Sequence, residues 1–263
     1  MIGRILTLAT IVWLGMLRRK DLYVLFILLG AMLLLLVSLN VFGLGSVTGY
    51  VADTGLLMTW AFAWIMAIAA GARELPQEEA RRTVFPLLAK PVSRAEVLLG
   101  KWLGAWTVVC AATAVFYGLV ALIVVAGGGG FSPAALAQAY VLHGALLAFV
   151  TATGLLLSTR LNFDAAATLT AILTAASFLV VPRIPAFLTR ESGLAADALL
   201  ALYFLLPHVE IFDLRRRLVH DLGPAPAWAV GGVLLYGALL TAACLYLAWL
   251  AYRRKHFVRG SMG

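Results

Sequence analysis

The chain has 263 residues, of which 63% are hydrophobic and only 12% are charged. Soluble domains average about 25% charged residues, so this chain lacks the polar side chains needed to cover a water-facing surface, and a soluble protein is excluded. A net charge of +8 would suggest nucleic-acid binding in a soluble protein. In a membrane protein it raises a different question, namely which side of the bilayer holds the cations, and we expect no nucleic-acid partner.

Six long stretches of the chain contain no Asp, Glu, Lys or Arg. Each is long enough, or nearly so, to cross a hydrocarbon core of ~30 Å as a helix, the form that satisfies its own backbone hydrogen bonds. The sequence therefore predicts an all-α integral membrane protein with a single transmembrane domain of six helices. The predicted spans are residues 22–43, 54–72, 102–126, 136–158, 165–181 and 227–251.

The positions of the cations predict the orientation in the bilayer. If the N-terminus is inside, fifteen of the twenty Lys and Arg residues fall on the cytoplasmic side, as the positive-inside rule requires. Both termini are then cytoplasmic, and we expect a multi-pass protein of the inner (cytoplasmic) membrane. Residues 73–101 form a cytoplasmic loop in this topology, and residues 182–226 form the last extracytoplasmic loop.

Two further apolar segments are too short or too polar to count as spans. Residues 1–20 end on Arg-Arg-Lys and contain several Gly and Thr residues, which predicts an interfacial helix on the inner leaflet. Residues 194–206 are apolar apart from Asp197 and stop before Pro207. Thirteen residues are too few to cross the bilayer, so this segment is expected to be a re-entrant or surface helix in the last outer loop.

The loop at 73–101 is the most charged stretch of the chain. Pro76 suits the first turn of a helix and would place the glutamates at 78–79 near the positive end of its dipole. We therefore expect a short amphipathic helix to begin at Pro76. Further along, Ser-Arg-Ala-Glu at 93–96 matches a capping box, which predicts that the third long helix starts at Arg94, still in the cytoplasm.

Two motifs in the chain resemble those of a known family. The run 83–101 contains Lys-Pro-Val-Ser-Arg at 90–94 and Leu-Gly-Lys at 99–101. It resembles the loop between the second and third helices of type 2 ABC exporter permeases, where a glutamate-bearing helix, a Thr, a Leu-rich turn, Pro-Val-Ser-Arg and Gly-Lys recur in this order. The segment 207–214 is similar to one in the branch that includes the copper-maturation and gliding-motility permeases.

This resemblance implies a coupling helix that rests in a groove of a separate cytoplasmic ABC ATPase and transmits its closure to the membrane helices. ATP and magnesium would be bound by that partner, and no cofactor by this chain. The resemblance also implies an exporter in which two permeases, identical or related, pair with two ATPases. Side chains of both signs suit such a docking surface. The candidate docking residues are Glu78, Glu79, Arg81, Arg82, Thr83, Lys90, Pro91, Ser93 and Arg94.

Motifs that the chain lacks bear on its energy source. Gly100-Lys101 has neither the upstream Gly nor the following Ser or Thr of a phosphate-binding loop, so ATP hydrolysis is expected in a separate subunit. The predicted spans hold no Asp, Glu, Lys or Arg and no histidine other than His143, which argues against proton coupling. We expect His143 to make an interhelical hydrogen bond.

Two alternative functions stay open. An integral membrane enzyme would need a site in the outer loop, where these residues cluster without a recognised metal-ligand spacing: His208, Glu210, Asp213, His220 and Asp221. The simpler interpretation is a polar surface helix after Pro207. The second alternative is a purely structural membrane subunit. Hydroxyls at i, i+4 and i+7 of the fifth span either bond across helices or line a wet transport pathway, and these are Thr170, Thr174 and Ser177.

Overall fold

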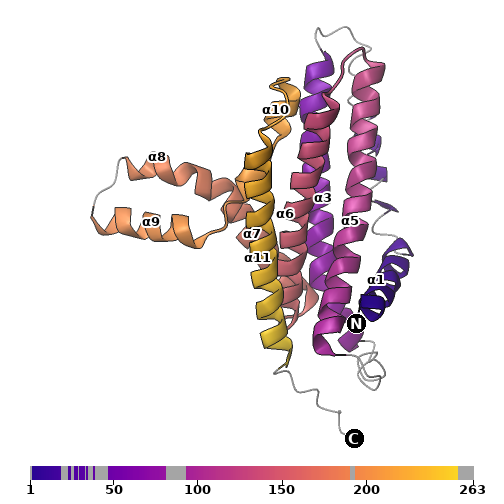
Figure 1. Ribbon diagram of the computed structural model, residues 1–263, viewed down its shortest axis with the longest axis vertical. Coiled ribbons are helices and arrows are strands. Elements are labelled where there is room, and N and C mark those ends of the chain that lie inside the picture. Colours follow the sequence, from indigo (N-terminus) through magenta and orange to yellow (C-terminus); the bar gives the residue numbers. More distant parts are fainter. Residues whose placement is uncertain are drawn as a thin grey trace, which may run out of the picture.

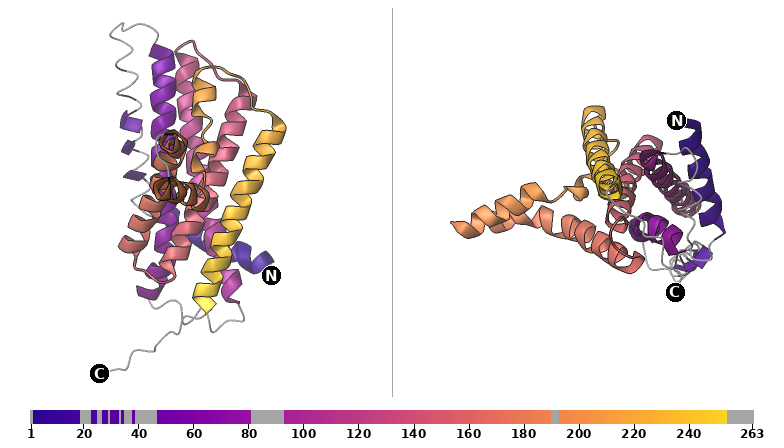
Figure 2. Two further views of the ribbon diagram at one scale, coloured as in Figure 1. Left: turned by 90° about the vertical axis from the view of Figure 1, so that its left-hand side faces the viewer. Right: turned by 90° about the horizontal axis from the view of Figure 1, so that it is seen from below.

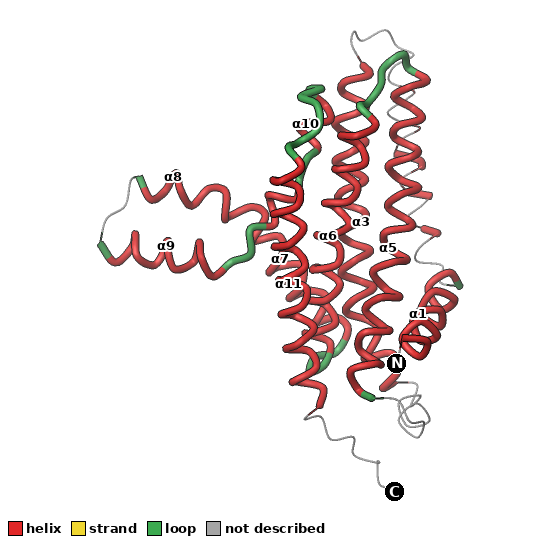
Figure 3. Tube along the Cα trace, in the orientation of Figure 1, coloured by secondary structure: helices red, strands yellow, loops and turns green. Residues whose placement is uncertain are grey.

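The computed structural model describes residues 2–18, scattered positions between 23 and 38, and residues 47–80, 93–189 and 193–253. Regular structure in these residues is exclusively helical (Figure 1, Figure 3). The longer helices are α1 (Ile2–Leu17), α3 (Val47–Ala80), α5 (Arg94–Ala126), α6 (Pro133–Ser158), α7 (Phe163–Val180), α9 (Leu194–Leu205) and α11 (Ala227–Arg253). The short ones are η1 (Val181–Arg183), α8 (Ile184–Leu188), η2 (Val209–Phe212) and α10 (Arg215–Val219).

Among the residues that the structure describes, five helices are long and apolar enough to cross a membrane: α3, α5, α6, the run Phe163–Leu188 and α11. The predicted all-helical membrane fold is therefore confirmed. The first predicted span, 22–43, lies largely outside the described residues. The pair Leu194–Leu205 and Val209–Val219 meets the same criteria jointly with a bend of 43°, the geometry of a broken span or a re-entrant loop. Membrane placement of 194–206 stays a prediction.

Helix α6 lies at the centre of the bundle, because it packs against α3, α5, α7 and α11. It crosses α3 at unusually short range. A Cβ atom at Gly71 would overlap the carbonyl oxygen of Thr151, and one at Gly154 would lie 2.9 Å from the backbone nitrogen of Ala72. Small residues allow such backbone contact between membrane helices, so these two glycines set the spacing of the central pair.

Helix α1 lies against the lower half of α5 in the view of Figure 1. Gly104 of α5 faces it so closely that a Cβ atom there would lie 2.8 Å from the carbonyl oxygen of Ala9. Trp13 donates a hydrogen bond from Nε1 to Thr107 Oγ1 at 2.8 Å. The face of α1 that α5 does not cover exposes residues such as Ile2 and Leu14. The short apolar N-terminal helix is thus present, and its position on the inner leaflet stays a prediction.

Helix α3 does not end where the sequence predicts a new helix. It runs through Pro76 without a break to Ala80, so the expected start of a separate helix at Pro76 is wrong. The reason is tertiary: Leu75 is buried with Leu98 and Tyr252 in a small apolar cluster, which holds this turn in helical form despite the proline. At 34 residues, α3 is about 51 Å long and exceeds a ~30 Å hydrocarbon core.

Helices α8 and α9 form a hairpin that projects sideways from the bundle (Figure 1, Figure 2). None of the residues of α9 is buried, and Leu194, Phe204 and Leu205 are at least three-quarters exposed. Gly193 begins α9 with a positive φ of 67°, a conformation that glycine adopts without strain. The hairpin therefore belongs to the outside of the bundle, as an apolar projection.

Candidate functional site

The C-terminal end of α3 and the N-terminal end of α5 extend beyond the apolar part of the bundle as two adjacent arms. We call residues 73–80 and 94–101 the stalk; residues 81–92, which connect its arms, lie outside the described residues. Lys101, only 4% exposed, lies between the arms. Its Nζ is 2.7 Å from Glu78 Oε1 and 3.3 Å from Glu74 Oε2, and it also donates to the Glu74 carbonyl at 3.4 Å.

A buried cation of this kind is tolerated only when it is paired and hydrogen-bonded. Glu74 and Glu78 lie one turn apart on the same face of α3, so both carboxylates reach the same ammonium group. The Glu74 side chain is 9% exposed and that of Glu78 21%. The interaction is thus shielded from water, and it joins the two arms of the predicted coupling loop into one unit.

A capping box starts the second arm, as the sequence predicts. Ser93 Oγ accepts a hydrogen bond from the Glu96 backbone N–H at 3.2 Å, and the Ser93 backbone N–H donates to Glu96 Oε2 at 2.8 Å. The backbone and hydroxyl donors of Ser93 hold the pKa of the Glu96 carboxyl below its ordinary value. These reciprocal bonds fix the start of α5 at Arg94.

Arg94 ties the stalk to the last membrane helix. Its Nη1 donates to the carbonyl oxygens of Tyr252 and Arg253, each at 2.8 Å, and its guanidinium lies 5.8 Å from the centre of the Tyr252 ring. The last carbonyls of a helix have no partner within the helix, so a cation there is favourable. The stalk consequently contacts α11.

The predicted docking residues fall into three groups in the structure. Glu78, Ser93 and Arg94 make the internal contacts just described. Glu79 lies in the last turn of α3. Outside the described residues lie Arg81, Arg82, Thr83, Lys90 and Pro91. Docking on a partner stays a prediction for all nine.

Sequence reasoning missed Glu74 and Lys101 as site residues. A signal for them exists: the glutamates are spaced i, i+4 on one helix face, and Lys101 directly precedes the apolar run of the third span. A single cation at the start of an apolar run is a candidate for burial against a carboxylate. The sequence does not predict that the two arms lie close together.

Replacing Ser93 with Ala should destabilise the protein by about 1 kcal/mol, because it removes a side chain that caps α5. Denaturant titration in detergent would measure this loss. The matched control is Ser132→Ala, since Ser132 is the N-cap of α6 but its side chain makes no capping hydrogen bond. An equal loss for both variants would mean that the cap at Ser93 contributes nothing specific.

The polar residues of the predicted outer loop do not form a metal site. Among the described residues, no group of three or more His, Cys, Asp or Glu is placed to hold a metal ion. Asp213 instead accepts two hydrogen bonds from the Arg215 guanidinium, at 2.9 Å from Nε and 2.7 Å from Nη2, and this guanidinium lies 4.9 Å from the centre of the Trp60 ring. This ion pair attaches the segment to α3.

The segment after Pro207 also differs from the predicted surface helix. It forms two short helices, η2 and α10, and Val209 and Phe212 of η2 are fully buried. Phe212 fits against Gly237, where a Cβ atom would lie 2.9 Å from its ring. The expectation of a surface helix is therefore wrong, because apolar residues between the charges anchor this segment in the bundle.

His143 forms the interhelical hydrogen bond that the sequence predicts. Its Nδ1 lies 3.4 Å from the hydroxyl of Tyr117 on α5, and its ring stacks on Trp60 with 5.2 Å between centroids. The side chain has no exposed surface. These contacts are those of a packing residue that joins α3, α5 and α6.

The predicted hydroxyl face of α7 is buried within the chain. Thr170, Thr174 and Ser177 each donate to a carbonyl one turn earlier, at 2.7, 2.7 and 2.9 Å. Trp64 of α3 donates from Nε1 to Thr174 Oγ1 at 3.0 Å. These contacts favour bonding across helices. A transport pathway along this face stays a prediction, and it requires α3 and α7 to separate.

The fold and the ion-paired stalk define a multi-pass α-helical membrane protein with a charged extension at one end of its bundle. Residues 28–256 match the family described as ABC-2 family transporter protein. This match covers most of the chain, so the protein belongs to the ABC-2 family of transporter permeases. Comparison with curated proteins gives no match. The copper-maturation and gliding-motility branch stays a prediction.

Proposed function

We propose that the chain is the permease subunit of an ATP-driven exporter in the inner membrane. It pairs with a second permease, identical or related, and with two cytoplasmic ABC ATPases that bind ATP and magnesium. Membership of the ABC-2 family supports this proposal. The structural observation that supports it most is the burial of Lys101 between Glu74 and Glu78, because it makes the base of the predicted coupling loop a single unit.

The stalk is suited to transmit movement from a partner to the membrane. Helices α3 and α5 run without interruption from the stalk into the apolar bundle, so a displacement of loop 81–92 would move both helices together. Arg94 extends the connection to α11, and the close approach at Gly104 extends it to α1. Movement on closure of the ATPase pair would thus be transmitted through the stalk to four helices: α3, α5, α11 and α1.

This arrangement divides the predicted docking residues by role. Glu78, Ser93 and Arg94 hold the base of the loop, because their described contacts lie within the chain. The surface that meets the ATPase then consists of the residues farther along the loop. These are Glu79, Arg81, Arg82, Thr83, Lys90 and Pro91.

Co-expression with its cognate ABC ATPase tests this function. The purified chain alone should hydrolyse no ATP, and the co-expressed proteins should purify as one complex with ATPase activity. As a control, the same complex with the Lys of the ATPase phosphate-binding loop replaced should form but be inactive, since that Lys contacts the phosphates. ATP turnover by the isolated chain, or failure of the two proteins to associate, would contradict the proposal.

A further inference from the structure

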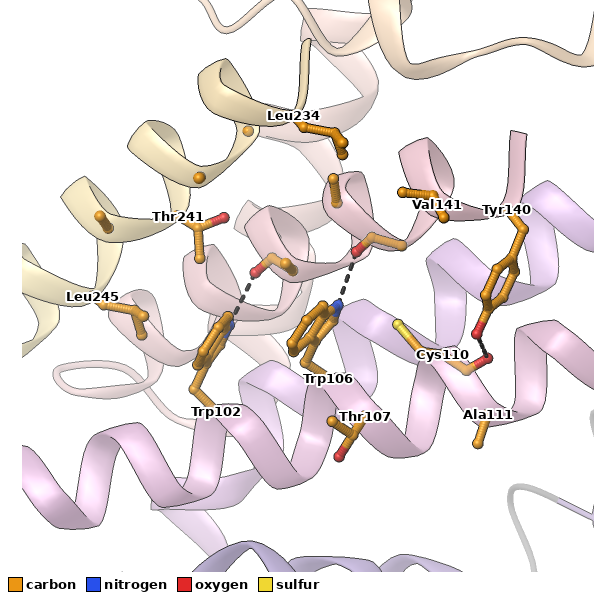
Figure 4. A pocket seen from close by; sticks show the side chains of 16 residues that line it. Trp102, Trp106, Thr107, Cys110, Ala111, Tyr140, Val141, Leu234, Thr241 and Leu245 are labelled. Carbon is orange, nitrogen blue, oxygen red and sulfur yellow. Dashed lines mark hydrogen bonds between the residues drawn. The ribbon is translucent and has the colours of Figure 1, made fainter. Parts of the chain in front are cut away.

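An apolar groove of about 760 Å³ lies between α5, α6 and α11 (Figure 4). Two stacked indoles, Trp102 and Trp106, form one wall, with 5.3 Å between centroids and 9° between planes. Small residues of α11 create the hollow, and these are Gly237, Ala238 and Ala242. The groove therefore arises from the packing of the helices, because aromatic rings face small residues across it.

The polar atoms of the aromatic wall are already bonded within the protein. Trp102 and Trp106 donate from Nε1 to the carbonyl oxygens of Ala148 and Gly144, at 3.0 and 2.8 Å, and Tyr140 donates its hydroxyl proton to the carbonyl oxygen of Cys110 at 3.1 Å. The rings consequently present carbon surfaces to the groove. Burial of apolar surface is then the main source of binding free energy, which suits a hydrocarbon chain.

The length of the groove along α11 is close to the thickness of one leaflet of a bilayer. Its lining residues on α11 recur with helical spacing from Leu234 to Leu245, a rise of about 16 Å, and half of a ~30 Å hydrocarbon core is ~15 Å. Trp102, at the lower end, begins the apolar part of α5 next to the stalk. In the predicted topology the groove thus opens toward the cytoplasmic leaflet at this end.

Two exposed cations lie beyond the lower end of the groove, about two helical turns of α11 past Leu245. The lining of the groove on α11 ends at Leu245. Trp249 lies one turn farther along the same face of this helix, and the guanidinium of Arg253 lies 5.1 Å from the centre of the Trp249 ring. Arg160 reaches the same turn, where its Nη2 donates to the carbonyl oxygen of Ala251 at 3.2 Å. Basic residues between membrane helices on the cytoplasmic side are typical of sites for anionic lipid headgroups.

We propose that this groove binds an anionic phospholipid of the cytoplasmic leaflet. One acyl chain lies between the indoles and the small residues of α11, and the phosphate lies beside Arg160 and Arg253. The lipid joins α5 to α11, which packs mainly on α6. This inference does not depend on the ATPase partner.

Native mass spectrometry of the full chain, exchanged into equal amounts of phosphatidylglycerol and phosphatidylethanolamine with identical acyl chains, tests the site. We expect phosphatidylglycerol to be retained over phosphatidylethanolamine by about tenfold, since each cation near a headgroup adds attraction. Ala242→Phe fills the groove and should abolish retention. Leu239→Phe is the matched control, because Leu239 is 61% exposed on α11 and does not line the groove. Arg160→Gln with Arg253→Gln should remove the headgroup preference.

Equal lipid retention by Ala242→Phe and Leu239→Phe would overturn the proposal, as would a wild-type protein without headgroup preference. If Ala242→Phe keeps its lipid but loses a dimer that the wild type forms, the groove is instead an interface between two copies of the chain. If Ala242→Phe does not fold, fluorescence decides the matter. Phosphatidylglycerol brominated along its chains should quench the Trp fluorescence of the wild type. The quenched fraction should be smaller in Trp102→Phe than in Trp13→Phe. Equal quenching in both variants would contradict the site.

Discussion

Replacing Lys101 with Met should destabilise the folded chain by about 3–5 kcal/mol, the usual effect of removing one partner from a buried ion pair. The Glu74 carboxylate, 9% exposed, would lose its cation while remaining shielded from water. The arms of the stalk would also lose their link, so the ATPase activity of the complex should become independent of the permease. Denaturant titration in detergent measures the first effect, and ATPase assays of the complex measure the second.

Two further variants separate the ion pair from other effects of this change. Adding Glu74→Gln to Lys101→Met should recover part of the lost stability, because it removes the unpaired buried charge. Arg216→Met is the matched control, since Arg216 is an exposed cation at the opposite end of the bundle. A Lys101→Met protein as stable as the Arg216→Met control would show that the ion pair of Lys101 with Glu74 and Glu78 contributes little to the free energy of unfolding.

Replacing Gly71 with Val should cost about 3 kcal/mol or more, at or above the upper end of the usual range for overpacking. The new side chain would meet the backbone of Thr151 rather than a movable side chain, so α3 and α6 must separate along the centre of the bundle. We expect a lower yield of folded protein and a lower thermal midpoint in detergent.

The control for this change is Gly118→Val in α5, where nothing lies within 4 Å of the added Cβ atom. Both substitutions place the same β-branched residue in a long membrane helix. Their difference therefore reports the helix crossing and not helix propensity. Similar thermal midpoints for the two variants would mean that α3 and α6 are not in backbone contact.

Features that depend on local sequence were predictable. Long uncharged stretches predicted the apolar helices because a helix in lipid must satisfy its own backbone groups. The Ser93 capping box was predictable because its four residues are contiguous. The contact of His143 with a neighbouring helix followed from the cost of an isolated polar group in an apolar span.

Features that depend on distant segments were not predictable from one sequence. Pro76 predicts a helix start by its local preference, but Leu75 and Glu78 make contacts that keep α3 helical through it. The burial of Lys101 depends on the distance between α3 and α5. Likewise, the charges around Asp213 suggested a surface helix, whereas Val209 and Phe212 anchor that segment in the bundle.

The claim that loop 73–101 docks on an ATPase is tested most directly by reversing its charges and measuring how much ATPase co-purifies with the permease. Glu79→Arg with Arg82→Glu avoids the buried ion pair, so the bundle should keep its wild-type thermal midpoint. Arg216→Glu is the control for a charge reversal at the opposite end. We expect the double variant to lose most of the bound ATPase, and the control to keep it. Wild-type amounts of ATPase bound to the double variant would contradict docking through this loop.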